Sequence, residues 1–490
     1  MINRQRPAFL LLSLALLCAT ALTAAPAPRP NVLFIAADDL RTDLGSYGST
    51  EAKTPNLDAL ARRGVLFERA YCQQAVCNPS RASIMTGRRP DTLKVWDLRT
   101  HFRQALPEVV TLPQHFKQHG YTAIDIGKIF HNESGTKPPI PFCDPRSWSE
   151  PPLFAEGAHW QDDPTNPKAK GGAMQRLDVP DEAYFDGKIA TAACEKLRVL
   201  AAKRDQPFFL AVGFWKPHLP FNAPKKYWDL YDRAKLKPPG FTRMPEGAPP
   251  IAGHPSKEVR GYGGVPEEGP LSPELIAELR HGYLAGVSFL DAQVGRVIGE
   301  LDRLGLAKNT VIVFWSDHGF HLGEHDLWAK TSNYELDTRV PLLVAAPGIA
   351  GGGRAMGLVE LLDVYPTLAD LCGLPAAMGV EGESFAPLLR DPKRAGKPIA
   401  ISQHPHPSYG KATHMGYTVR TPQLRYVEWR DLTTGALFAR ELYDHKADPA
   451  ETVNRVNDSR YASDVKSLGG QVQEIAAASG RWPAIKAGGR

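Results

Sequence analysis

Five short apolar runs, rich in β-branched residues, most constrain the fold of this chain. Helical patterns separate them, and they cover residues 32–36, 121–126, 208–214, 310–315 and 342–345. Continuous apolar runs of this length are typical of parallel strands that crossover helices bury on both faces. The sequence therefore predicts an α/β fold with a mostly parallel central sheet between helices.

Proline and glycine mark the ends of several of the intervening helices. We expect helices to open at Pro55, Pro79 and Pro273 and to end at Gly64, Gly87 and Gly305. Proline fits the first helical turn, where the N–H groups lack a helical partner, and glycine fits the position just past the end.

Two later segments lack helical or strand periodicity. Residues 235–270 are crowded with proline and glycine, so they form either an ordered rim over a pocket or a mobile lid. Residues 391–398 form a polar, proline-containing joint, and residues 418–429 and 441–443 indicate an antiparallel element beyond it. We therefore expect a larger domain over residues 30–394 and a small α+β C-terminal subdomain over residues 395–490.

The N-terminus has the pattern of an export signal. Arg4 and Arg6 precede an uncharged run over residues 8–22, and small residues follow at 23–25. A run of this length is short for a membrane span, so we expect cleavage after about residue 25 and no span in the mature protein. The mature protein would be periplasmic or extracellular, or lysosomal in a eukaryote. An uncleaved anchor is the alternative.

Charge and cysteine content exclude some classes of protein. The chain has 58 Lys+Arg against 53 Asp+Glu, a net charge of +5 over 490 residues, which does not call for a nucleic-acid partner. Its six cysteines are few for this length and include no C-x-x-C pair that would suggest zinc. The sequence leaves disulfide pairing open.

Polar clusters follow four of the predicted strands. They are Asp38-Asp39, Gly127-Lys128 with His131 beyond, Lys216-Pro217-His218, and Asp317-His318. In open α/β sheets, ligands bind at the carboxyl ends of the strands. We therefore expect these carboxylates, imidazoles and ammonium groups to surround one crevice.

Three of these carboxylates form a candidate metal site. Asp38, Asp39 and Asp317 could not share a partly buried site as free anions without raised pKa values or a cation, and a hard divalent ion prefers oxygen ligands. A single Asp after a strand is more often a helix cap or turn residue, but two such strand ends together favour the metal. His318 is either a ligand or a residue that orients one.

Cys77 lies at a predicted helix N-terminus, within Cys77-Asn78-Pro79-Ser80-Arg81. Free amides and the helix dipole favour negative charge there, so a sulfur or oxygen nucleophile would be activated. The alternative is a half-buried cysteine that happens to precede a helix.

These residues carry a resemblance. C-N-P-S-R, followed by M-T-G-R-R, resembles the modification signature of the type I sulfatases. The segments N-V-L-F-I-A-A-D-D-L-R, G-K-I-F-H, F-L-A-V-G-F-W-K-P-H-L-P-F, S-D-H-G-F-H-L-G-E-H-D-L-W-A-K and M-G-Y-T-V-R-T resemble the iduronate-2-sulfatase branch of that family in order and spacing. The resemblance runs from Asn31 to about Asn454, and it implies an alkaline-phosphatase-like core.

The resemblance also implies a modified nucleophile. A formylglycine-generating or anaerobic maturation enzyme would oxidise Cys77 to Cα-formylglycine, whose aldehyde hydrates to a geminal diol. One hydroxyl would attack sulfur, the sulfate would transfer to residue 77 and the alcohol would leave. Loss of the second hydroxyl proton would then expel sulfate and restore the aldehyde.

One Ca²⁺ ion is part of what the resemblance implies. It would be held by Asp38, Asp39, Asp317 and His318, together with an oxygen of the modified Cys77. Such an ion would lower the pKa of the attacking hydroxyl and offset charge on the sulfate oxygens.

Five basic residues receive roles by the same resemblance. Arg81 and Lys128 would steady residue 77 in its ionised form, and His131 would act as base towards the diol. His218 would donate to, or polarise, the leaving oxygen, and Lys330 would bind the sulfate. Considered singly, four of them could be ordinary loop or surface residues, namely Lys128, His131, His218 and Lys330.

The expected substrate is a sulfated carbohydrate, with the 2-O-sulfate of iduronate in glycosaminoglycans favoured. His318 matches the iduronate branch, whereas Phe320 replaces a Trp found there and residues 143–178 follow that branch poorly. Another sulfated uronate or an algal polysaccharide is therefore an alternative. The remaining alternatives are a related phosphatase or phosphodiesterase, and a non-catalytic carbohydrate-binding protein if Cys77 stays a thiol.

Overall fold

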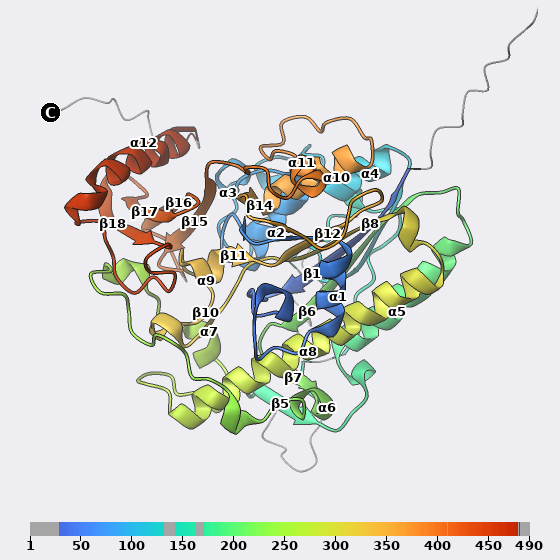
Figure 1. Ribbon diagram of the computed structural model, residues 1–490, viewed down its shortest axis with the longest axis horizontal. Helices are drawn as coiled ribbons and strands as arrows, with labels where there is room; N and C mark the ends of the chain where they lie inside the picture. The colour runs from blue at the N-terminus through green and yellow to red at the C-terminus, as the bar shows by residue number, and fades with distance from the viewer. Residues whose placement is uncertain are drawn as a thin grey trace, which may run out of the picture.

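A seven-stranded sheet forms the centre of the molecule (Figure 1). The computed structural model describes residues 29–131, 143–157, 159–161, 171–408, 410–478 and 480, so the expected signal over residues 1–25 lies outside them. The strand order is β13-β2-β12-β8-β1-β6-β4. The strands are β1 (Asn31–Asp38), β2 (Val65–Phe67), β4 (Thr122–Gly127), β6 (Phe208–Pro217), β8 (Thr310–Ser316), β12 (Leu342–Ala345) and β13 (Gly353–Ala355).

Four neighbouring strands, β8, β1, β6 and β4, run parallel, which confirms the predicted α/β class. The predicted strand at 342–345 also forms, but β12 runs antiparallel to β8, with Leu343 opposite Phe314. A parallel neighbour needs a crossover that returns the chain to the other end of the sheet. The segment from 317 to 341 contains only short elements, and the chain turns back at the end of the sheet where β8 stops.

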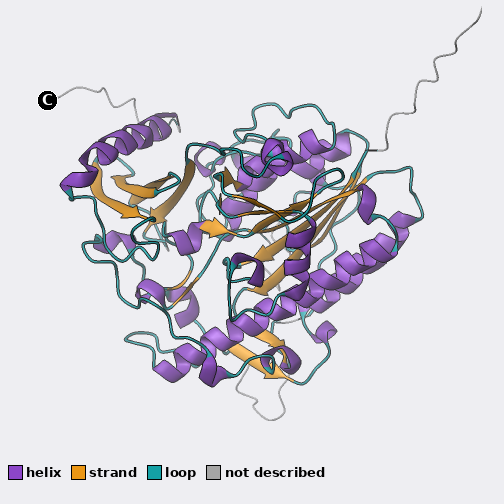
Figure 2. Ribbon diagram, viewed as in Figure 1, coloured by secondary structure: helices purple, strands orange, loops and turns teal. Residues whose placement is uncertain are grey.

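Helices cover both faces of the sheet (Figure 2). Alternate side chains of β1 enter two separate cores, because side chains along a strand point to opposite faces. Leu33 and Ile35 pack in one core with residues of α1 (Pro55–Arg63), α5 (Phe185–Ala201) and α8 (Pro273–Arg303). Val32 and Phe34 pack in the other core with residues of α2 (Cys77–Thr86), α4 (Leu112–Gln118) and α10 (Val364–Leu371).

The expected helix signals are mostly confirmed. The Ser272 hydroxyl accepts a hydrogen bond from the Leu275 amide at 3.2 Å and caps α8. Helix α2 begins at Cys77, two residues before the expected start at Pro79. Pro79 is tolerated at the third position because the first four N–H groups of a helix have no partner within it.

The C-terminal region contains the expected antiparallel element. Strands β15 (Ala400–His406), β16 (His414–Arg420), β17 (Leu424–Asp431) and β18 (Leu437–Asp444) pair in sequence order. Helix α12 (Ala462–Ala478) packs Val465, Leu468 and Val472 onto this sheet. The domain boundary near residue 395 stays a prediction.

The described residues contain no disulfide: Cys72, Cys77, Cys143, Cys194 and Cys372 are all free thiols. Across the same part of the chain, we find no helix with the length and apolar character needed to cross a bilayer.

Candidate active site

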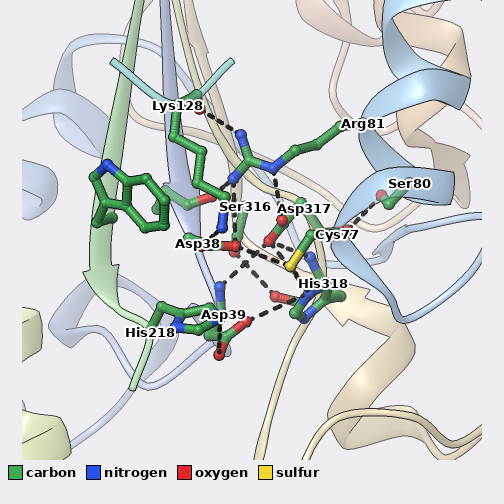
Figure 3. A network of polar contacts seen from close by, with 12 residues as sticks. Asp38, Asp39, Cys77, Ser80, Arg81, Lys128, His218, Ser316, Asp317 and His318 are labelled. Atoms are coloured by element: carbon green, nitrogen blue, oxygen red, sulfur yellow. Dashed lines mark hydrogen bonds and ion pairs between the residues drawn. The ribbon is translucent and has the colours of Figure 1, made fainter. Parts of the chain in front are cut away.

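The predicted strand-end residues meet at one place (Figure 3). Asp38 is the last residue of β1, Asp317 and His318 follow β8, and Lys128 follows β4. His218 follows β6, and Cys77 is the first residue of α2. Cys77, His131, His218 and Lys330 line a cavity of about 700 Å³. The structure thus brings together every site residue named from the sequence.

Cys77 lies directly against the acidic cluster. Its Sγ is 3.4 Å from Asp38 Oδ1 and 3.3 Å from His318 Nε2. His318 Nε2 is in turn 3.4 Å from Asp39 Oδ1 and 3.7 Å from Asp317 Oδ1. All five side chains are buried, so their charges act on one another with little screening by water.

The backbone turns sharply at Asp39, which has a φ of 63°. This left-handed conformation is uncommon outside glycine, although Asp adopts it more readily than most residues. Two contacts hold it: the Asp39 N–H donates to Asp317 Oδ1 at 3.3 Å, and the Tyr283 hydroxyl donates to the Asp39 carbonyl at 2.8 Å. The turn lets two consecutive residues, Asp38 and Asp39, direct carboxylates at one centre.

Arg81 lies one helical turn after Cys77 and binds the strand ends together. Its Nε donates to Asp317 Oδ2 at 2.8 Å, and its Nη2 donates to the Ala37 carbonyl at 3.1 Å. A third bond goes to the Lys128 carbonyl. The side chain is fully buried and its hydrogen bonds go to the carboxylate ligands and the backbone, so Arg81 positions the candidate ligands relative to α2.

Lys128 supplies a second buried cation beside Asp38. Its ammonium group pairs with Asp38 Oδ2 and lies 4.3 Å from the ring centroid of Trp215. Burial opposes ionisation of Asp38, but Lys128, helped by Arg81, holds the pKa of this carboxyl well below its usual value. Asp38 is therefore an anion in the folded protein.

Lys330 lies between two carboxylates on the cavity wall. Its Nζ is 3.0 Å from both oxygens of Asp39 and 2.7 Å from Glu258 Oε1. The residues on either side, Ala329 and Thr331, have φ values of 77° and 89°. Such conformations are rare for alanine and strained for a β-branched residue, and local strain of this kind is concentrated at functional sites.

The donor set fits a divalent cation. Ligand atoms of Asp38, Cys77, Asp317 and His318 all lie within 4.8 Å of one another. Burial, and then the nearby carboxylates, raise the pKa of Asp39 well above its usual value, although Lys330 opposes this shift. Several buried carboxylates that repel one another are what a hard cation with oxygen ligands would stabilise. The geometry therefore provides a candidate metal site.

His131 and Cys77 both line the cavity, and their pKa values are shifted in opposite directions. Burial, and then the Lys128 charge, lower the pKa of His131 to about 3, so its imidazole is neutral near pH 7 and can accept a proton. Burial, and then Asp38, raise the pKa of the Cys77 thiol well above its usual value. Desolvation and the adjacent anion therefore favour the protonated thiol in the unmodified residue, and activation of a nucleophile at the helix N-terminus stays a prediction.

Sequence reasoning missed several residues that line the cavity. They are Trp96, Arg99, Lys257, Glu258, Thr331 and His404. None belongs to a motif used above. One sequence feature did indicate part of this lining: the Pro- and Gly-rich segment 235–270, which we interpreted as either a rim over a pocket or a lid. Helix α7 (Lys257–Arg260) of that segment contributes two lining residues, as a rim would.

Comparison with known proteins gives two family matches and close relatives. The family model "Sulfatase" matches residues 30–374, and "N-sulphoglucosamine sulphohydrolase, C-terminal" matches residues 323–478. Iduronate 2-sulfatase of Homo sapiens is 35% identical, over 88% of this chain and 92% of that protein. The Mus musculus protein of the same name is 34% identical, over 89% and 93% respectively.

Solved structures with the same fold are more distant in sequence. An enzyme in complex with its substrate D-glucosamine-2-N,6-O-disulfate has a TM-score of 0.74 and 22% identity, covering 94% of this chain and 100% of that one. A phosphonate monoester hydrolase from Silicibacter pomeroyi has a TM-score of 0.74 and 24% identity, covering 92% and 96%. These two support the fold alone. The family model and the 35% identical relative go further: this chain belongs to the sulfatase family and is a sulfuric ester hydrolase.

Proposed function

We propose that this enzyme removes the 2-O-sulfate of iduronate in glycosaminoglycans, through a formylglycine made from Cys77. The observation that carries the mechanism is the position of Cys77: it is the first residue of α2, on the cavity wall, with Sγ 3.3 Å from His318 and 3.4 Å from Asp38. The 34–35% identity to two iduronate 2-sulfatases supports the choice of sugar. Another sulfated polysaccharide would fit the same catalytic residues.

Formylglycine at residue 77, once hydrated, supplies a hydroxyl nucleophile, which a buried and protonated thiol does not. We propose that Asp38, Asp39, Asp317 and His318 hold one Ca²⁺ ion together with an oxygen of that residue. When bound, the ion supplies positive charge that lowers the pKa of a nearby hydroxyl and offsets charge on sulfate oxygens.

The proton transfers can be assigned to two histidines on the cavity wall. His131 is neutral at physiological pH and lines the cavity beside residue 77, so it accepts a proton from the nucleophile. His218 also lines the cavity, with Nε2 3.4 Å from Glu258 Oε1 and 3.9 Å from Asp39 Oδ2. Burial, and then the Lys330 charge, lower the pKa of His218 well below its usual value, so the free imidazole is neutral near pH 7. It would therefore polarise the leaving oxygen, or donate to it after gaining a proton beside these carboxylates.

Three cations hold the anionic groups in place. Arg81 and Lys128, which contact Asp317 and Asp38, counter the charge that develops at residue 77. Lys330 lines the cavity and would bind a sulfate oxygen. Fixed cations in a water-poor site stabilise the transition state because they need little reorganisation during the reaction.

The modification can be tested on one peptide. Trypsin releases residues 70–81, which contain Cys72 as well as Cys77. In protein co-expressed with a maturation enzyme, alkylation after unfolding should label only Cys72, and the mass should be lower by the difference between CH₂SH and CHO at residue 77. Two labels on the peptide, in protein that hydrolyses sulfate esters, would contradict the proposed nucleophile. Faster hydrolysis of phosphate than of sulfate monoesters would contradict the proposed substrate class.

Lys330→Ala should lower kcat/KM on sulfate esters by about 10²- to 10³-fold, the usual cost of losing one oxyanion contact. The loss should appear in initial rates measured with Ca²⁺ present, and thermal unfolding should confirm that the variant is folded. Lys226→Ala is the matched control, since Lys226 is an exposed lysine of α6 (Lys225–Trp228) that pairs with Asp181 outside the cavity. Equal rates in the two variants would remove Lys330 from the site.

A further inference from the structure

The cavity extends beyond the catalytic residues at its base. Its volume of about 700 Å³ lies in the range of sites for ligands larger than one sulfate group. The additional lining includes Trp96 and Arg99, which lie in a loop, and Lys257 of the short helix α7. Arg99 and Lys257 are both exposed, and they are cations that the proposed mechanism does not use.

Arg99 lies on a loop that is fixed to the nucleophile. The Asp97 carboxylate accepts hydrogen bonds from the amides of Arg99 and Thr100, both at 2.7 Å, which closes a tight turn. The Asn78 side chain then donates to the carbonyls of Asp97 at 2.8 Å and Thr100 at 2.9 Å. Because Asn78 directly follows Cys77, the turn that carries Arg99 has a fixed position relative to the reacting residue.

Lys257 is also held close to the candidate site, through its sequence neighbours. It is the first residue of α7, and the preceding residue, Ser256, accepts a hydrogen bond from the Trp328 amide at 3.0 Å. The following residue, Glu258, accepts from Lys330 at 2.7 Å and lies 3.4 Å from His218 Nε2. Lys257 is therefore adjacent in sequence to a residue that contacts two proposed catalytic groups.

The carboxylates of the cavity lining do not neutralise these two cations. The lining contains Asp97, which is bonded within its own turn, and Glu258, which pairs with Lys330. Within the part of the chain that the structure describes, neither Arg99 nor Lys257 forms a side-chain ion pair with a carboxylate. A guanidinium or ammonium group without a carboxylate partner in the protein is available to bind the carboxylate or sulfate oxygens of a ligand.

We propose that Arg99 and Lys257 form a second anion subsite, which binds a carboxylate or a second sulfate on the sugar whose sulfate ester is cleaved. The subsite rests on the proposed function, because it selects among sulfated carbohydrates rather than taking part in bond cleavage. A substrate with a second negative group then binds at two fixed points, whereas a neutral sulfated sugar binds at one.

The test uses three 2-O-sulfated hexosides that differ only at C6, which carries CH₂OH, a carboxylate or a sulfate ester. The double variant Arg99→Gln/Lys257→Gln should lose about 10- to 100-fold in kcat/KM on at least one charged substrate, mostly through KM, and less than about 3-fold on the neutral one. Arg99→Lys/Lys257→Arg should retain most of the preference. The wild-type preference should weaken as salt is raised. Lys308→Gln, an exposed position outside the cavity lining, is the control.

The possible outcomes distinguish a failure of the anion subsite from a failure of the proposed function. A loss confined to the carboxylate or to the C6 sulfate identifies which anion the subsite takes. Equal kcat/KM on all three substrates in wild type and double variant would overturn the subsite and leave the sulfatase activity intact. If wild-type enzyme with verified formylglycine hydrolyses none of the three or any other sulfated sugar, the proposed function fails and the subsite fails with it.

Discussion

Cys77→Ala should abolish sulfate ester hydrolysis, with kcat/KM falling by at least about 10⁴-fold, as expected when a nucleophile is removed from a unit of cooperating groups. The alanine side chain cannot be oxidised to an aldehyde, so no hydroxyl nucleophile can form at the start of α2. The acidic cluster should stay in place, because Arg81, rather than residue 77, bonds Asp317 to the ends of the parallel strands. Rates on an aryl sulfate and on a sulfated disaccharide give the measurement.

Cys72→Ala is the control for this variant. Cys72 is also fully buried, but its Sγ lies 3.8 Å from the Asp337 carbonyl and is absent from the cavity lining. The control should lose some thermal stability, on the order of 1 kcal/mol, and keep its catalytic rate within a few-fold. Residual activity above about 1% in Cys77→Ala would show that residue 77 is not the nucleophile.

Asp317→Asn should lower kcat/KM by about 10³-fold and should also remove the stabilisation of the fold by Ca²⁺. Asp317 has two functions that both need its charge. Its Oδ1 faces His318 and Asp39 in the candidate metal site, while its Oδ2 accepts from Arg81 at 2.8 Å. An amide of the same shape weakens cation binding and leaves the buried Arg81 with less compensating charge.

Thermal unfolding measures the second effect without any assay of activity. After treatment with a chelator, added Ca²⁺ should raise the melting temperature of the wild type and restore its activity, whereas Asp317→Asn should respond to neither. The control is Asp291→Asn, a buried carboxylate of α8 that accepts from the amides of Asn56 and Leu57. It should be less stable than the wild type yet keep its response to Ca²⁺. A full Ca²⁺ response in Asp317→Asn would exclude Asp317 as a ligand.

The cluster of candidate site residues at the strand ends could be predicted from the sequence because it obeys a general rule. Asp38, Lys128 and Asp317 each follow an apolar run, and the carboxyl ends of parallel strands lie at one edge of a sheet. The hydrophobic pattern predicts where the strands lie, and the strand ends predict where the polar side chains meet. The same periodicity does not contain strand direction, so the antiparallel course of β12 was not predicted.

The walls of the cavity could not be predicted in this way. Arg99, Lys257 and His404 lie in segments far apart in sequence, and no local pattern indicates that they meet. Their positions depend on tertiary contacts, such as the hydrogen bonds from Asn78 to the turn at Asp97. The pairing of Lys330 with Asp39 and Glu258 is equally non-local, because it joins three separate segments of the chain.

The central strands and the exposed outer segments of the cavity differ in how readily they can change, and this bears on how such an enzyme can diversify. The proposed catalytic and ligand residues lie mostly at or just beyond the ends of β1, β4, β6 and β8, with Cys77 at the start of α2, whereas Arg99 lies in an exposed loop and Lys257 in the short helix α7. Loops accept substitution and insertion more readily than buried strands do. Descendants of this chain could therefore acquire new sugar preferences by exchanging short surface segments while inheriting the reaction unchanged.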